Sequence, residues 1–304
     1  MYDVASLELR RRLVAHLRRR GYLRDRRVTQ AFLAVPRELF LPDELRRVGL
    51  SGVYRDDAIV TRRDPETRAP TSSSSQPAIM AVMLEMLDVQ PGDRVVEVGA
   101  GTGYNAALLD LLTGPAGLVV TVDVDLETAR AAARGLRSFR SGAHVVVADG
   151  AGGWPLTHET GIDRVMVTAS SDAVPRSWFD HLVPGGTVVV PLRLSDAVDR
   201  AHAVTAFVKV DDGFDSVAVT SGGFMPLRRP VPAGGSGGSA PAEPAVPDES
   251  PGPEQPMRRG PWMAVPRDDV SRLHLSVRYT EPPDSRWLIG RGDHWIGIDL
   301  LANL

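Results

Sequence analysis

The sequence predicts an α/β domain with a doubly wound, mostly parallel sheet. Short apolar strands alternate with helices between residues 94 and 190, and a glycine-rich turn joins the first of these strands to its helix. The 304 residues are 43% hydrophobic, which is enough to bury a sheet on both faces. Strands that are apolar throughout are typical of parallel sheets covered by helices on both sides. We therefore expect one main domain with additions at its ends.

Residues 1–90 are predicted to form an N-terminal helical subdomain. Helical spacing of apolar residues marks three helices: Leu9, Leu13, Val14 and Leu17 in the first, Val28, Phe32 and Val35 in the second, and Met80, Met83, Leu84 and Leu87 in the third. Pro77 fits the first turn of the third helix, because its missing N–H has no partner to lose there.

Residues 91–230 are predicted to form the α/β core. We expect strands at 94–98, 118–122, 144–148, 164–168 and 187–190, and helices at 104–112, 126–139 and 175–182. Two further apolar runs, 203–210 and 216–220, flank an Asp-Asp-Gly turn. They predict an antiparallel hairpin that closes one edge of the sheet.

The C-terminal part has a different composition. Residues 231–256 are rich in Gly, Pro, Ser and Ala and have almost no bulky apolar side chain, which is typical of a flexible linker. Residues 257–304 are too few to build an independent core. We expect them to form an extension that docks on the core.

Composition excludes several functions. A net charge of -3 and a pI near 6.2 argue against a nucleic-acid partner, which requires a basic surface. The absence of cysteine excludes disulfides, thiolate metal sites and cysteine nucleophiles. The histidines show no ligand-like spacing, so no metal is predicted. No apolar run has the length of a signal peptide or a membrane span, so we expect a cytoplasmic protein.

The segment VVEVGAGTGY, Val95 to Tyr104, is the main cofactor motif. Glycines at a strand-to-helix turn permit a tight bend and let backbone N–H groups approach a ligand. The third glycine of a dinucleotide fingerprint is replaced by Tyr104, which argues against a nicotinamide cofactor. Glu97 would repel a pyrophosphate but suits the cationic amino and sulfonium groups of S-adenosylmethionine.

Two more acids follow the next strands. Asp123 ends the second strand, where it would accept hydrogen bonds from ribose hydroxyls, and Asp149 ends the third, near the adenine amino group. Each acid alone could be a strand-end cap, and a dehydrogenase or another nucleotide-binding domain is the alternative. The predicted cofactor residues are Glu97, Gly99, Ala100, Gly101, Gly103, Tyr104, Asn105, Asp123, Val124, Asp149 and Gly150.

An ordered series of motifs carries a family resemblance. The segments VPRELFLPDELR, the Tyr54-Arg55-Asp56 element, SSSSQP, PGDRVVEVGAGTGY, VVVADGAGGWP, DRVMVTASSDAVP and LVPGGTVVVP together resemble the protein-L-isoaspartate O-methyltransferase family. The resemblance runs from about Gln30 to Leu227. It implies a Rossmann-like class I methyltransferase fold, S-adenosylmethionine as cofactor and S-adenosylhomocysteine as product.

The same resemblance implies the acceptor site. The family's Thr-Ile-Ser-Gln-Pro segment corresponds here to Ser73, Ser74 and Ser75 followed by Gln-Pro, with Ser75 beside the substrate carboxylate. Ser75 could instead only cap the following helix. The further substrate-binding residues that the resemblance implies are Tyr54, Asp56, Thr168, Ala169 and Ser170. A carboxylate is already ionised at neutral pH, so transfer requires alignment and exclusion of water, with no side-chain base.

The acceptor side departs from the family. The stretch before the serines, Val60 to Thr71, is longer and strongly charged, Ser74 replaces an isoleucine, and the chain continues past the usual end. These changes suggest a specialised enzyme that methylates an aspartate in a ribosomally made, modified peptide, such as a lanthipeptide or a graspetide, and yields a succinimide and then isoaspartate.

Repair of L-isoaspartyl residues in damaged proteins is the alternative. In either case the partner is a peptide or protein carrying an Asp or isoAsp carboxylate. A non-catalytic binding module with the same fold is a third hypothesis. A nucleic-acid N-methyltransferase is disfavoured, because TASSDAVP lacks the Asn/Asp-Pro-Pro-aromatic element.

Overall fold

The computed structural model describes residues 4–152, 154, 161–193, 202–228, 274–280, 284–291 and 294–299, the last two ranges as backbone only. The predicted linker at 231–256 therefore lies outside the described residues. The proposed division into four segments stays a prediction.

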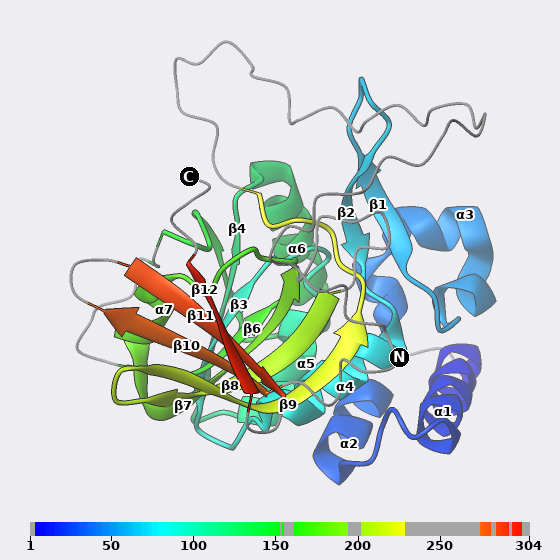
Figure 1. The fold of residues 1–304 in the computed structure, drawn as a ribbon. Coiled ribbons are helices and arrows are strands. Elements are labelled where there is room, and N and C mark those ends of the chain that lie inside the picture. The colour runs from blue at the N-terminus through cyan, green and yellow to red at the C-terminus, as the bar shows by residue number, and fades with distance from the viewer. Residues whose placement is uncertain are drawn as a thin grey trace, which may run out of the picture.

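Five parallel strands form one half of the main sheet (Figure 1). They are β3 (Arg94–Val98), β4 (Leu118–Asp123), β5 (His144–Val147), β6 (Ile162–Val167) and β7 (Leu182–Arg193). Their order is β7-β6-β3-β4-β5. The chain reverses direction across the sheet beside β3, so the carboxyl ends of β3 and β4 border the crevice where such folds bind ligands.

Antiparallel strands form the other half, and this half is larger than the predicted hairpin. Beyond β7 the order continues with β8 (His202–Val210), β9 (Gly213–Gly222), β10 (His274–Thr280), β11 (Asp284–Arg291) and β12 (His294–Asp299). Strand β10 pairs with β9 through Ser276 and Asp215, and Leu275 and Val277 are buried. The extension of the sheet could not be read from sequence, because β10 follows β9 only after 51 intervening residues, 223 to 273.

Helices cover both faces of the sheet, as predicted. On one face lie α1 (Val4–Arg19), α2 (Arg26–Ala34), α4 (Pro77–Leu87) and α5 (Tyr104–Thr113), while α6 (Leu126–Phe139) flanks β4 and β5. On the other face α7 (Arg176–His181) buries Trp178 against Val96 and Val165. Residues of β3 point to both faces of the sheet. Val95 packs in the core on the side of α4 and α5, and Val96 and Val98 pack in the core on the side of α7. The predicted helices and strands are confirmed to within a few residues at their ends, except that β7 begins five residues early.

A small region between the N-terminal helices and the core was not predicted from the sequence. It contains the 3₁₀ helix η1 (Arg37–Phe40), helix α3 (Pro42–Val53) and the antiparallel hairpin of β1 (Ile59–Arg63) and β2 (Pro70–Ser74). In Figure 1 the hairpin stands beside the carboxyl ends of the parallel strands, with β1 between β2 and α3. It contains the charged stretch Val60 to Thr71, which we expect from the resemblance to differ from the family.

Across the part of the chain that the structure describes, no helix is long and apolar enough to cross a membrane. The same residues contain no group of three or more acidic or histidine side chains placed to bind a metal ion.

Candidate active site

One pocket brings together the turn after β3, Gly99 to Gly103, and the serine-rich strand β2 with Ser75, which follows it. We call these the glycine turn and the serine strand. Its walls come from strand β2, the turn after β3, the ends of β4 and β6, and the segment 224–228 that follows β9. Predicted site residues that line it are Ser73, Ser74, Ser75, Glu97, Gly99, Ala100, Gly101, Tyr104, Asn105, Asp123, Val124, Gly150, Thr168 and Ala169. Two motifs that are 25 residues apart in the sequence thus face one cavity.

The glycine turn has no room for larger side chains. Gly99 has φ +99°, and a Cβ at this position would lie 2.4 Å from Thr168 Oγ1, whose hydroxyl donates a hydrogen bond to the Gly99 carbonyl. Gly101 has φ +51°, and a Cβ there would lie 3.2 Å from the carbonyl oxygen of Ser73. The turn therefore keeps backbone atoms at the pocket surface, where a ligand can approach them closely.

Glu97 is completely buried beneath this turn. Its carboxylate accepts hydrogen bonds from Thr121 Oγ1 at 2.6 Å and Asn105 Nδ2 at 2.7 Å. Burial raises the pKa of Glu97 to about 7, against the lowering effect of these bonds, and the charge of Asp123 adds to the rise. The Oδ1 atom of Asn105 is buried and has no hydrogen-bond partner among the described residues, although Asn105 lines the pocket. The Glu97 carboxyl group and the unpaired Asn105 oxygen are hydrogen-bond acceptors at the base of the pocket, and such acceptors suit a cationic ligand.

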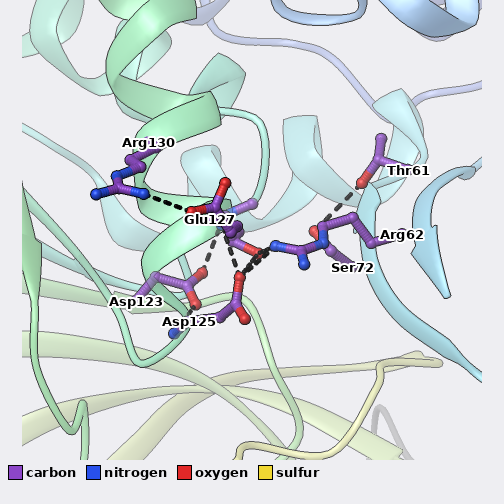
Figure 2. Close-up of polar contacts among 9 residues, drawn as sticks. Thr61, Arg62, Ser72, Asp123, Asp125, Glu127 and Arg130 are labelled. Atoms are coloured by element: carbon purple, nitrogen blue, oxygen red, sulfur yellow. Dashed lines mark hydrogen bonds and ion pairs between the residues drawn. The ribbon is translucent and has the colours of Figure 1, made fainter. Parts of the chain in front are cut away.

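Asp123 lies at the end of β4, on the rim of the pocket. It accepts hydrogen bonds from the N–H groups of Gly101, at 3.3 Å, and Asp125, at 3.0 Å (Figure 2). Burial raises the pKa of its carboxyl group, because the charged form loses solvent. Its oxygens still have acceptor capacity, since a carboxylate offers about four lone-pair sites.

The serine strand presents two available hydroxyls to the pocket. Among the described residues, Ser73 and Ser75 line the cavity and their hydroxyl groups make no hydrogen bond, while Ser74 is buried and accepts one from Arg37. Ser75 does not cap helix α4, whose N-cap residue is Gln76. The alternative in which Ser75 is only a cap is therefore wrong.

Arg37 holds this strand from behind and is itself fully buried. Its guanidinium donates to the carbonyls of Val53, at 3.0 Å, and Ser75, at 3.0 Å, and to the Ser74 hydroxyl at 3.3 Å. It also reaches the carbonyls of Arg55 and Asp57. Burial lowers the pKa of Arg37, and the nearby tyrosines and acids oppose that shift. One side chain thus fixes the backbone on both sides of the hairpin.

The comparisons with known proteins agree with this geometry. A family model described as Protein-L-isoaspartate(D-aspartate) O-methyltransferase (PCMT) matches residues 8–228. The chain belongs to the protein-L-isoaspartate O-methyltransferase family. The match spans the N-terminal helices, the hairpin, the glycine turn and the segment 224–228, and it stops before β10.

Relatives of this family are similar over most of their own length. A protein-L-isoaspartate O-methyltransferase of Methanopyrus kandleri is 40% identical over 192 residues, which is 62% of this chain and 79% of the relative. That of Hyperthermus butylicus is 38% identical over 231 residues, 72% of this chain and 88% of the relative. A solved structure of a protein-L-isoaspartate O-methyltransferase is 33% identical, with a TM-score of 0.63, and covers 72% of this chain and 66% of that one.

A second solved structure supports the fold alone. It is described as a protein-L-isoaspartate O-methyltransferase from Plasmodium falciparum in complex with S-adenosyl-L-homocysteine, and it is 17% identical, with a TM-score of 0.58. It covers 71% of this chain and 96% of that one. The Rossmann-like class I methyltransferase fold predicted from the sequence is thereby confirmed.

Five predicted site residues lie outside the pocket lining, and each has another structural role. The Tyr54 hydroxyl donates a hydrogen bond to the carboxylate of Glu38 in the N-terminal region. Asp56 accepts a hydrogen bond from Ala78 N at 2.8 Å and so caps helix α4, the role that Ser75 lacks. These two acceptor-side predictions came from the resemblance to the family, which does not determine where a side chain points.

The other three residues support backbone turns. Gly103 is the N-cap of α5, and a Cβ there would lie 2.9 Å from the carbonyl oxygen of Ala132. Asp149 accepts from Ala151 N at 2.9 Å. Ser170 exchanges backbone hydrogen bonds with Met225 and Leu227, which anchors the segment 224–228 at the pocket rim.

The pocket is also lined by residues that were not predicted to belong to the site. Met80 and Met83 of α4, Met166 of β6 and the segment from Phe224 to Arg228 contribute to its walls. Arg37 belongs to the motif VPRELF, but nothing in that motif indicates that its side chain reaches the serine strand 38 residues later. Arg228 is the one cation in the described lining, and its relation to the site required the fold.

Proposed function

We propose that this protein is an S-adenosylmethionine-dependent carboxyl O-methyltransferase that methylates L-isoaspartyl residues of proteins and peptides. The supporting observation is that one pocket is lined both by the serine strand and by the glycine turn with Glu97 beneath it. Membership in the family and the names of the similar relatives favour the L-isoaspartyl acceptor over the dedicated-peptide hypothesis.

The residues of the pocket fit S-adenosylmethionine. At Gly99 and Gly101, a Cβ would occupy the space beside the backbone that a ligand needs. Glu97 and Asn105 offer hydrogen-bond acceptors for a cationic amino group. Asp123 offers carboxylate oxygens to ribose hydroxyls. Gly150 lines the same cavity near the end of β5, on the side where we expect the adenine. When bound, the cofactor supplies an electrophilic methyl group on its sulfonium.

The acceptor carboxylate needs orientation more than activation. The hydroxyls of Ser73 and Ser75 are available to donate to one carboxylate oxygen while the other attacks the methyl carbon in line. No proton has to be removed, because the carboxylate is ionised at neutral pH. Methyl transfer would form the O–CH₃ bond, break the S–CH₃ bond and release S-adenosylhomocysteine as the product. The backbone nitrogen that follows the ester can then displace methanol to form a succinimide, which water opens to aspartate or isoaspartate.

A second candidate is methylation of an aspartate in one dedicated, modified peptide. Two features of the chain favour it: the charged hairpin β1–β2 borders the acceptor site, and strands β10 to β12 extend the sheet beyond the family match. Added surface of this kind can recognise a single partner. Lanthipeptides and graspetides are the peptide classes that this hypothesis proposes.

Mass spectrometry of three peptides tests both candidates. The enzyme and S-adenosylmethionine are incubated with a linear isoaspartyl peptide, its aspartyl counterpart and a cyclic aspartyl peptide. Methylation of the linear isoaspartyl peptide alone supports the proposed function. Methylation of the cyclic aspartyl peptide alone would replace it with the second candidate. Turnover of none, with intact cofactor binding, would contradict both in favour of a binding module.

A further inference from the structure

One ion pair ties the β1–β2 hairpin to the cofactor side of the pocket. Arg62, on β1, pairs through Nη1 with Asp125, and the same nitrogen lies 3.4 Å from Thr128 Oγ1. Figure 2 shows the guanidinium reaching from the hairpin to the start of α6. Arg62 belongs to the charged stretch Val60 to Thr71, whereas Asp125 precedes α6, and the proposed function assigns the pair no role.

An irregularity in the hairpin accompanies this reach. Val60 pairs with Ser73 and Arg62 pairs with Ser72, so β1 has one residue more than β2 between these two positions. Such a bulge redirects the side chains that follow it. The neighbouring Arg63 behaves differently, because it donates to the Arg68 carbonyl inside the hairpin and is exposed.

Asp125 is held firmly at the other end. It is the N-cap of α6 and accepts from Thr128 N at 2.7 Å and Thr128 Oγ1 at 2.8 Å. Burial opposes ionisation, but the bonds from Thr128 and the charge of Arg62 outweigh it and hold the pKa of Asp125 below its ordinary value. Its own N–H bonds Asp123, the proposed ribose ligand.

These contacts close a ring around the pocket rim. Strand β2 lies close to the glycine turn at Ser73, because a Cβ added to Gly101 would lie only 3.2 Å from the Ser73 carbonyl oxygen. The Gly101 N–H bonds Asp123, the chain runs on to Asp125, and Arg62 returns to the hairpin. Arg228, which also lines the pocket, acts on Asp123 and Asp125 by its charge, but it makes no hydrogen bond or ion pair with the described residues.

We propose that Arg62 is a positioning residue for methyl transfer. Its ion pair with Asp125 holds the serine strand at a fixed place over the glycine turn, so that the acceptor carboxylate meets the methyl group in line, and it keeps the hairpin closed over the bound cofactor. This proposal rests on the proposed function, because it assumes that the serine strand holds the acceptor.

A double-mutant cycle tests the proposal. The variants are Arg62→Gln, Asp125→Asn and the two combined, and Arg63→Gln is the matched control on the same hairpin. Asparagine is a good N-cap, so Asp125→Asn leaves α6 capped. We expect each single variant to lower kcat/KM for the isoaspartyl peptide about threefold to fivefold, the range typical of a partly exposed pair. The double variant should lose no more than either single variant, since both remove one interaction.

Two readouts do not depend on methyl transfer. Hydrogen exchange of the backbone amides of residues 59–74 should be faster in Arg62→Gln than in Arg63→Gln. The dissociation rate of S-adenosylhomocysteine, measured by competition, should rise in Arg62→Gln. High salt should reduce the wild-type advantage, because it screens the pair.

The opposite results would overturn the proposal. The pair positions nothing if Arg62→Gln and Arg63→Gln have equal kcat/KM values, hydrogen-exchange rates and dissociation rates. Additive losses of kcat/KM in the double variant would show that Arg62 and Asp125 act separately. If the wild type methylates no isoaspartyl peptide, the proposed function fails first. In that case, hydrogen exchange and S-adenosylhomocysteine release still decide whether Arg62 closes the hairpin.

Discussion

The two sides of the pocket are built in different ways. The glycine turn is a local structure, in which β3, the turn and α5 follow one another within 20 residues, Arg94 to Thr113. The serine strand β2 depends on remote side chains: Arg37 from the N-terminal region donates to the Ser74 hydroxyl and to the Ser75 carbonyl, and Arg62 links the hairpin to α6. The cofactor side is therefore sensitive to added atoms, whereas the acceptor side is sensitive to the loss of an arginine.

This difference explains how one side can vary while the other stays within a family pattern. A turn whose backbone atoms form the binding surface tolerates few substitutions, because any Cβ meets backbone or Thr168. A strand positioned by long side chains can be rebuilt by exchanging those side chains.

The largest effect is expected at Arg37. Arg37→Met should lower the free energy of unfolding by about 3 kcal/mol, because several buried carbonyls lose their donor. Urea denaturation measures this loss, with Arg63→Met as an exposed control of the same size change. A loss below 1 kcal/mol would mean that the acceptor side does not depend on this arginine.

A smaller effect, confined to the cofactor side, is expected for Gly99→Ala. The added methyl meets Thr168 Oγ1 at 2.4 Å in a left-handed backbone conformation, so cofactor affinity should fall roughly a hundredfold. Gly92→Ala is the matched control, because Gly92 has φ +90° but nothing within 4 Å of the added Cβ. Isothermal titration with S-adenosylhomocysteine compares them, and similar affinities for the two variants would contradict the steric account.

A pH dependence is expected from Glu97. Its folded pKa, about 7, lies above the ordinary value of 4.5, so its contribution to stability is fully present below pH 4.5 and is lost as the pH rises through 7. Between pH 5 and 8 the wild type should lose roughly 2 kcal/mol more unfolding free energy than Glu97→Gln. Urea denaturation at both pH values measures the difference, and parallel pH profiles of the two proteins would show that Glu97 is already ionised at pH 5.

The smallest effect is expected on the rate alone. Ser75→Ala should lower kcat about tenfold with cofactor affinity unchanged, because it removes one donor to the acceptor carboxylate. Ser72→Ala is the control, since the Ser72 hydroxyl is already bonded to Thr61 at 3.2 Å. Steady-state kinetics with an isoaspartyl peptide separates kcat from KM. Equal rates for the two variants would remove Ser75 from the proposed site.

The cofactor side was largely predictable from sequence. Glu97, Gly99, Gly101 and Asp123 were expected at one crevice, because the carboxyl ends of neighbouring parallel strands meet at one edge of a sheet, and all four line the pocket. Gly103 and Asp149 were expected there too, but the structure shows that they support the start of α5 and a turn. Spacing predicts that a residue lies near a crevice, but it does not predict whether that residue faces the pocket.

The acceptor side was predictable only through its resemblance to a family. The hairpin went unpredicted because Val60 to Ser74 is charged and serine-rich, with no alternation of apolar residues to mark strands. Tyr54 and Asp56 were expected at the substrate, yet they bond Glu38 and cap α4. The extent of the antiparallel half was missed for a related reason, since β9 and β10 pair across a long stretch of chain.

The sequence alone determined the parallel α/β core and its glycine turn, because apolar periodicity and backbone conformation are local properties that neighbouring residues impose. The tertiary structure decided which remote side chains complete the site. Arg37 and Arg62 reach the serine strand and α6 through contacts between segments 37 and 63 residues apart or more. Such contacts depend on how the hairpin, η1 and α6 pack together, and no local pattern records that packing.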